Sequence, residues 1–249
     1  MNILVCISRV PDTAAKIKVA GDNKSVETAG VKFILNPYDE YALEEAIQLH
    51  ESKGGELTVV TVAGDEATDI LRTALAMGAD KAIHIKANQL EKDSFFVANN
   101  IANVAKELNP DIIFLGKQSI DFDSFQISSL LGGLLDLPSV DVVSSLNYSD
   151  NTISGEKDIE GGKESFETSL PAIVSVQKGI KEPRYPKLPQ IMKAKQKPIE
   201  IKVAIETPLR TEILEMTLPE KARAGKILSG SDADIDELVR LLHEDAKVI

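Results

Sequence analysis

Residues 111–138 read DIIFLGKQSIDFDSFQISSLLGGLLDLP, in which an apolar run, a polar stretch and a second apolar pattern follow one another directly. Ile112 to Leu115 form an unbroken apolar run, which is typical of a strand covered on both faces of a sheet. After Gly116 the chain becomes polar, and from Ile127 onward leucines recur at helical spacing. The stretch therefore predicts a buried parallel strand, a loop at its carboxyl end and a helix.

The polar loop that begins at Gly116 is the best candidate ligand site in the sequence. Ligands of open α/β sheets bind at the carboxyl ends of the strands, and the free N–H groups of the next helix favour an anion such as a phosphate. Lys117 supplies positive charge, whereas Asp121 and Asp123 suit helix capping, ribose hydroxyls or backbone N–H groups. The expected ligand is a nucleotide. From these residues alone, a plain strand-to-helix connection with a solvated Lys117 is an equally good interpretation.

The same succession of elements recurs along most of the chain. Apolar runs predict strands at residues 3–7, 57–62, 82–85, 112–115 and 172–176, and helical patterns occur at 38–52, 67–77, 94–108 and from 127 onward. This alternation predicts a doubly wound, mostly parallel α/β sheet with right-handed crossovers. Residues 16–33 read as a hairpin-like excursion, and residues 140–148, 152–159 and 164–170 read as strands of added hairpins.

The composition excludes several classes of protein. The chain has 28 Lys and Arg against 39 Asp and Glu, a formal charge of -11, which argues against nucleic acid as a partner. Its single cysteine, Cys6, excludes an internal disulfide and a multi-cysteine metal site. No apolar run approaches the ~18 residues that a membrane helix needs, and the amino terminus does not read as a secretory or transit peptide. We therefore expect a cytoplasmic protein, if the source is a bacterium, with no direct insertion into a membrane.

The sequence contains no recognisable set of catalytic residues. Neither a P-loop nor a GxGxxG fingerprint occurs. The three histidines have no zinc-ligand spacing, and an acidic cluster at the sheet edge, formed by Asp12, Asp39, Asp121 and Asp123, shows no spacing typical of a general acid and base. The sequence therefore shows no convincing catalytic constellation, and we expect this chain to supply no catalytic residues of its own.

Two segments after residue 176 depart from the α/β pattern. Residues 182–200 carry four prolines and five basic side chains, so this stretch cannot be a core element throughout. Residues 201–249 contain one amphipathic helix, at 232–246, and are too few to bury a core of their own. The sequence thus predicts a domain at residues 1–200 and a carboxyl-terminal arm at 201–249 that packs on a partner subunit or back on the sheet.

Five separated motifs resemble one known family. They are Asn36-Pro37 followed by Glu44-Glu45-Ala46, RTALAMGAD at 72–80, LGKQSID at 115–121, DIEGGKE at 158–164 before LPAIVS, and EPRYPKLPQIMKAK at 182–195. In this order they resemble the beta subunit of electron transfer flavoproteins, and the resemblance runs to about Pro198. Departures are Phe166, where an aliphatic residue is usual, and Phe122 and Phe125, where polar residues are commoner.

The resemblance implies a subunit that binds a structural AMP and pairs with an alpha subunit, which holds the redox-active FAD. It implies electrons that arrive from flavin dehydrogenases, such as acyl-CoA dehydrogenases, and leave to a membrane quinone oxidoreductase. The positions that match the family's nucleotide-binding motifs are Cys6, Asn36, Pro37, Tyr38, Asp39, Ala63, Gly116, Lys117, Gln118, Ser119, Ile120, Asp121, Phe122, Asp123, Ser124, Phe125, Gln126 and Ile127. We expect the phosphate on backbone N–H groups near residues 123–126.

Residues 182–195 are the expected docking loop for partner dehydrogenases. Prolines fix a protruding backbone at low entropic cost, and an exposed Leu188 among basic residues suits a transient apolar anchor. The docking residues are Tyr185, Leu188, Pro189, Ile191, Met192 and Lys193. The alternative is that Leu188 packs into this chain's own surface.

Two other functions compete with this interpretation. A flavin-bifurcating relative would hold a second FAD in the AMP site, and VPDT at residues 10–13 also resembles such proteins, whereas LGKQSID resembles the AMP type. A nucleotide-sensing module of the universal-stress type would explain the first half of the chain only. The identity of the bound nucleotide separates the first alternative, and the oligomeric state separates the second.

Overall fold

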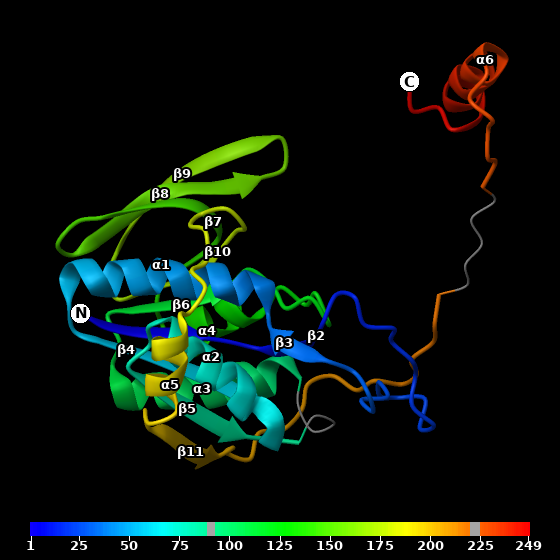
Figure 1. Cartoon of the computed structure of the whole chain (residues 1–249). Helices are drawn as coiled ribbons and strands as arrows, with labels where there is room; N and C mark the ends of the chain where they lie inside the picture. Colours follow the sequence, from blue (N-terminus) through cyan, green and yellow to red (C-terminus); the bar gives the residue numbers. More distant parts are fainter. Residues whose placement is uncertain (89–92, 220–224) are drawn as a thin grey trace. The chain divides into compact units, whose positions relative to one another are not determined.

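The computed structural model describes residues 1–88, 93–219 and 225–249, and it divides into two compact units (Figure 1). The first unit is Met1–Met216 and the second is Thr217–Ile249. No helix of the described ranges is both long and apolar enough to cross a membrane.

A nine-stranded sheet organises the first unit, in the order β11-β5-β4-β1-β6-β10-β7-β8-β9. All neighbours from β11 to β7 are parallel, and β8 and β9 extend the sheet as antiparallel strands. The strands are β1 (Asn2–Cys6), β4 (Glu56–Ala63), β5 (Lys81–Lys86), β6 (Ile112–Gly116), β7 (Ser139–Tyr148), β8 (Thr152–Ile159), β9 (Gly162–Ser169), β10 (Ala172–Val176) and β11 (Ile199–Val203). The expected doubly wound α/β sheet with added hairpin strands is therefore confirmed.

Helices cover both faces of the parallel part of the sheet (Figure 1). One face carries α1 (Pro37–Lys53), α2 (Thr68–Met77) and the short α5 (Leu188–Ala194), and the other carries α3 (Ser94–Leu108) and α4 (Ile127–Leu135). Successive side chains of a strand point to opposite faces. Accordingly Ile3 and Val5 of β1 pack in the core under α1, whereas Leu4 and Cys6 pack in the core under α3.

The excursion after β1 agrees with the sequence prediction, whereas the domain boundary near residue 200 differs from it. The hairpin-like excursion expected at residues 16–33 is confirmed: Val19 and Val26 form an antiparallel bridge around the turn at residues 21–23, and β2 (Arg9–Pro11) pairs antiparallel with β3 (Phe33–Leu35) at its base. Strand β11 pairs with β5 at the edge of the main sheet. The expected domain boundary near residue 200 thus falls inside a strand, and residues 204–216 also belong to the first unit.

Buried and half-buried polar side chains attach residues 204–216 to α3. Asn100 accepts a hydrogen bond from the Ile205 N–H at 2.7 Å, and Asp93 accepts from the N–H groups of Arg210 and Thr211 at 2.6 and 2.9 Å. Asp93 is also the N-cap of α3, because its other oxygen accepts from the Phe96 N–H at 2.7 Å. One carboxylate therefore starts a helix and holds the chain that follows β11.

The second unit contains α6 (Asp232–Arg240), which continues into a π-helical turn at Leu241–Asp245. A capping box of Ser231 and Asp234 begins α6. Its apolar side chains are exposed, with Ile235 at 56%, Leu238 at 45% and Val239 at 51%. Within its described residues, this unit therefore presents an amphipathic helix without an apolar covering of its own.

Candidate functional site

Two buried side chains at the start of α1 join the carboxyl ends of the central strands. The Asp39 carboxylate accepts hydrogen bonds from the N–H of Ser8, after β1, at 2.7 Å and from the N–H of Gly116, at the end of β6, at 3.0 Å. Asn36 uses both ends of its amide: Nδ2 donates to the Gln118 carbonyl at 2.9 Å, and Oδ1 accepts from the Ile120 N–H at 3.3 Å. The predicted nucleotide loop is thus held from below by α1.

Gly116 is required where β6 meets α1. A Cβ placed on Gly116 would lie 2.6 Å from Oδ1 of Asp39 and 2.6 Å from the backbone and Cβ of Tyr38. These distances are far shorter than a van der Waals contact, so a side chain at this position would displace the carboxylate. The glycine of LGKQSID therefore allows the close approach of two backbones.

Burial sets the protonation of the groups below the loop. Removal from water raises the pKa of Asp39 to about 7, although hydrogen bonds from Asn36 and from the N–H groups of Ser8 and Gly116 oppose this shift. Burial, with a smaller contribution from the Asp39 carboxylate, raises the pKa of the Cys6 thiol far above its ordinary value. Cys6 is therefore a protonated, packed thiol at the end of β1, without the reactivity of a thiolate.

The loop itself is exposed and has an unusual backbone. Asp123 and Phe125 both adopt left-handed conformations, with φ of 48° and 55°. The Asp123 carboxylate accepts from Nε2 of Gln118 at 2.6 Å, and its N–H donates to the Ser119 carbonyl at 3.0 Å. In the described part of the chain, the N–H groups of Ser124, Phe125 and Gln126 have no protein acceptor. Three consecutive free donors therefore precede α4, an arrangement that suits an anion.

Other predicted site residues surround this loop. The Lys117 ammonium lies 5.0 Å from the centroid of the Tyr38 ring, a cation–π contact that places the lysine beside the start of α1. Ala63 is buried at the end of β4, where the imidazole of His84 lies 2.9 Å from the Gly64 carbonyl and 3.2 Å from the Ala63 carbonyl. Phe122 is 57% exposed and Phe125 40% exposed, so neither ring packs into this chain's core.

The aspartates of the expected acidic cluster bind separate partners rather than one another. Asp12 pairs with Lys32 at 3.0 Å, Asp39 is buried, and Asp121 accepts from the Phe122 N–H at 2.9 Å. Sequence reasoning missed a different carboxylate, Asp141 of β7, which accepts hydrogen bonds from Ser128, Ser129 and Ser175. These three serines lie on α4 and β10, and no local spacing relates them to Asp141.

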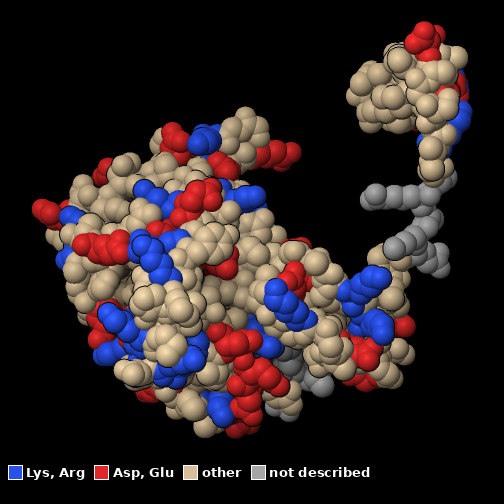
Figure 2. Space-filling model, in the orientation of Figure 1, with Lys and Arg blue, Asp and Glu red and all other residues tan. Residues whose placement is uncertain are grey.

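The predicted docking loop folds partly as α5 and exposes an apolar surface. Tyr185 is 94% exposed, Leu188 72%, Met192 55% and Ile191 41%, whereas Ala194 on the inner side is 1% exposed. Leu188 therefore does not pack into the surface of this chain. Figure 2 shows basic side chains gathered on the face that carries α5. The segment supplies three exposed lysines, Lys187, Lys193 and Lys195.

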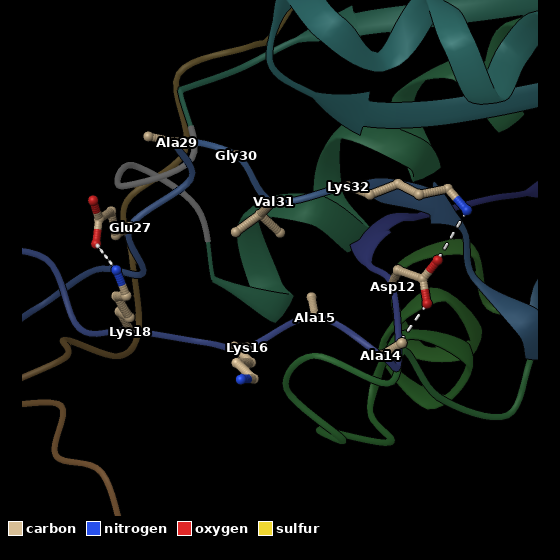
Figure 3. A pocket seen from close by; sticks show the side chains of 10 residues that line it. All are labelled: Asp12, Ala14, Ala15, Lys16, Lys18, Glu27, Ala29, Gly30, Val31 and Lys32. Atoms are coloured by element: carbon tan, nitrogen blue, oxygen red, sulfur yellow. Dashed lines mark hydrogen bonds and ion pairs between the residues drawn. The ribbon is translucent and has the colours of Figure 1, made fainter.

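A separate pocket of about 400 Å³ opens within the excursion between β2 and β3 (Figure 3). Two of its lysines are neutralised by ion pairs, Lys32 with Asp12 at 3.0 Å and Lys18 with Glu27 at 3.9 Å. Its lining shares no residue with the predicted nucleotide loop.

Comparisons with known proteins agree with the motifs. A family model described as the electron transfer flavoprotein domain matches residues 24–206. The chain is 42% identical to the electron transfer flavoprotein subunit beta of Bacillus subtilis over 259 aligned residues, and the alignment covers 100% of both chains. It is 39% identical to the mitochondrial subunit beta of Arabidopsis thaliana, also with 100% of both chains covered. It is 40% identical to the subunit beta of Syntrophomonas wolfei, with 90% of this chain and 88% of the relative covered. The chain therefore belongs to the electron transfer flavoprotein family, as a member of its beta subunits.

Proposed function

We propose that this chain binds AMP at the carboxyl edge of its sheet and helps to enclose an FAD that an alpha subunit holds. Membership of the beta subunits of a flavoprotein family implies the alpha subunit and the flavin. The AMP assignment is carried by the three free N–H groups of Ser124, Phe125 and Gln126 in the described structure, because they are consecutive and directly precede α4. AMP is structural in this proposal, and the chain supplies no catalytic residues.

The nucleotide can be identified directly. We expect denatured heterodimer to release one AMP and one FAD, which mass spectrometry distinguishes. Release of two FAD molecules would instead support the flavin-bifurcating alternative, which VPDT at residues 10–13 favours. Absence of any nucleotide beyond the alpha subunit's FAD would contradict the assignment.

A matched pair of glutamine variants locates the site. Gln126 is the exposed N-cap residue of α4, and its side chain makes no capping hydrogen bond. We expect Gln126→Ala to lower the AMP retained after gel filtration by several-fold. Gln196→Ala removes an exposed glutamine outside the loop and should retain AMP fully. Equal retention by both variants would place the phosphate elsewhere.

We further propose that residues 182–195 dock flavin dehydrogenases, such as acyl-CoA dehydrogenases, whose electrons the heterodimer passes to a quinone oxidoreductase. The support is the exposed apolar ridge of Tyr185, Leu188 and Met192 on an otherwise acidic protein. Leu188→Ala should raise the KM for the heterodimer in a dehydrogenase assay and leave the flavin spectrum unchanged. An unaltered KM would contradict the docking role.

The second unit is proposed as an arm that binds the alpha subunit. Its α6 exposes Ile235, Leu238 and Val239, which need an apolar surface. Truncation after Met216 keeps β11 and the segment attached to Asp93, so it removes only this unit. We expect the truncated chain to lose heterodimer assembly in gel filtration. Unchanged assembly would show that the arm has another role. In a bacterial source we place the heterodimer in the cytoplasm.

A further inference from the structure

The docking segment, residues 182–195, belongs to a long crossover between two distant strands. It follows β10 and precedes β11, and these strands are five positions apart in the sheet. Adjacent strands lie about 4.8 Å apart, so the crossover spans about 24 Å across the α1 and α2 layer. A connection of this length is flexible unless something attaches it to the surface that it crosses.

Arg184 attaches the first end of the segment to α1. Its Nε lies 2.9 Å from Oε2 of Glu44, its Nη2 lies 2.9 Å from Oε1 of the same carboxylate, and its Nη1 lies 2.5 Å from Glu51. The Arg184 N–H also donates to Glu44, at 3.2 Å. Glu44 has a side-chain exposure of 3%, so this bidentate pair holds both the backbone and the guanidinium in one geometry.

Arg72 attaches the other end to α2. Its Nη1 donates to the carbonyl of Ala194 at 2.6 Å and to the carbonyl of Lys197 at 2.8 Å, so it satisfies two acceptors at the end of α5. In return, Lys197 donates to the carbonyls of Leu75 and Ala79 at the end of α2, at 3.2 and 2.5 Å. A cation at a helix carboxyl terminus is favourable.

The ridge lies between these attachments and faces outward. Tyr185, Leu188 and Met192 are exposed, whereas Ala194 beside the Arg72 contact is buried. None of the attaching side chains is part of the exposed ridge. The two arginines can therefore fix the backbone of residues 182–195 while Tyr185, Leu188 and Met192 stay exposed.

We propose that Arg184 and Arg72 are positioning residues, which hold the docking segment in its binding conformation before a partner dehydrogenase arrives. This inference rests on the proposed docking role of residues 182–195. A binding surface that is already ordered loses less conformational entropy on association. Release of either end should therefore weaken the encounter and leave the flavin chemistry unchanged.

Steady-state reduction of the assembled heterodimer tests the inference, with an acyl-CoA dehydrogenase and its acyl-CoA substrate as the electron source. We expect Arg184→Met and Arg72→Met to raise the KM for the heterodimer by about tenfold, with kcat and the flavin spectrum unchanged. Hydrogen exchange of residues 182–195 should accelerate in the same variants. Arg184→Lys keeps the charge without the planar fork and should restore part of the affinity.

Two further variants make the outcome decisive. Arg184→Met leaves the buried Glu44 without its cation and can destabilise the chain. Glu51→Gln changes only a 56% exposed carboxylate, and it should raise the KM by roughly two- to threefold. The control is Lys81→Met, which removes an ion pair of 2.5 Å with Glu56 at the amino-terminal edge of the sheet and should leave the KM unchanged.

Leu188→Ala separates failure of the inference from failure of the docking proposal. If Leu188→Ala raises the KM but the Arg184, Arg72 and Glu51 variants do not, docking stands and the positioning role is wrong. If Leu188→Ala also leaves the KM unchanged, the docking proposal fails, and the inference fails with it. A joint loss of kcat, flavin spectrum and assembly in Glu51→Gln would likewise overturn the positioning role.

Discussion

The nucleotide loop at residues 117–126 and the docking segment at residues 182–195 are both exposed connections, but different means hold them in place. The first is held by two short, buried side chains, Asn36 and Asp39, which bind backbone groups directly. The second is held by long side chains, Arg184 and Arg72, which reach across the surface of the helices. Short buried anchors shape a site that leaves N–H groups free, whereas long cationic anchors present a ridge whose apolar side chains face outward.

The largest expected effect on stability comes from the close contact of Gly116 with Asp39 and Tyr38, at the start of the nucleotide loop. Gly116→Ala places a methyl group 2.6 Å from Oδ1 of Asp39 and should lower the free energy of unfolding by about 4 kcal/mol, because it overpacks the site and disturbs two backbone hydrogen bonds. Denaturant unfolding of the heterodimer at fixed concentration measures this. The matched control is Gly133→Ala in α4, where a Cβ meets nothing within 4 Å; it should stabilise by ~0.5–1 kcal/mol. Similar values for the two variants would show that the loop adjusts freely.

The second effect depends on pH and is specific to the buried anchor. The pKa of Asp39 is about 7 in the folded chain, against 3.8 as its ordinary value. Between about pH 4 and pH 7 the folded state therefore holds a proton that the unfolded state has lost. The contribution of this group to stability falls as the pH rises through that window, by up to about 1.4 kcal/mol per pH unit, and is constant above it.

The variant Asp39→Asn isolates this dependence. The variant is less stable at every pH. Its amide N–H₂ group is a donor, and it replaces a carboxylate oxygen that accepts a hydrogen bond from the N–H of Ser8 or Gly116, so two donors face each other. The difference in free energy of unfolding between wild type and variant should shrink as the pH rises from 4.5 to 7. The Cys6 thiol beside Asp39 stays protonated across this range and adds no slope. If the free energies of unfolding of wild type and variant changed with pH in parallel, the Asp39 carboxylate would be ionised throughout this range.

A smaller effect distinguishes the two regions by salt. Glu51 is 56% exposed in its pair with Arg184, and exposed pairs contribute on the order of 0.5 kcal/mol that added salt screens. Raising KCl from about 50 mM to about 500 mM should accelerate hydrogen exchange in residues 182–195 by about twofold. Exchange at the N–H groups of Ser8 and Gly116, which bind the buried Asp39, should not change. An equal response in both regions would remove the distinction.

The smallest effect on stability is expected at the ridge itself. Leu188 is 72% exposed, so Leu188→Ala should change the free energy of unfolding by less than about 0.5 kcal/mol. The control is Leu131→Ala in the core of α4, where the side chain is 0% exposed and the expected loss is about 3 kcal/mol. A loss for Leu188 comparable to that for Leu131 would assign Leu188 to the core.

The sequence predicted the elements that have a strong local pattern. The switch from an apolar run to polar residues at Gly116 located β6 and its loop, and Asn36-Pro37 located the start of α1 because proline fits the first turn of a helix. Helix α5 was missed because four prolines in residues 182–200 indicated a loop. Pro189, however, lies in the first turn, where its missing N–H costs no hydrogen bond.

Long-range pairing limited the rest of the prediction. Strand β11 reads as a short alternation of apolar and polar residues, and nothing in that pattern identifies β5 as its neighbour. Arg184 and Glu44 are separated by 140 positions in the chain, and Asn36 and Gln118 by 82. Such contacts follow from the folding of the whole sheet, so local residue spacing cannot reveal them.

The crossover from β10 to β11 also determines where substitutions and deletions can accumulate in this chain. The width of the sheet fixes the distance that the crossover must cover, and a deletion outside the two anchors would pull on β11, which has only one neighbour in the sheet. Between Arg184 and Ala194 the backbone is held at both ends by hydrogen bonds to Glu44 and Arg72. We therefore expect substitutions within residues 185–193 to leave β11 in place, because the contacts of Arg184 and Arg72 that attach the crossover lie outside this range.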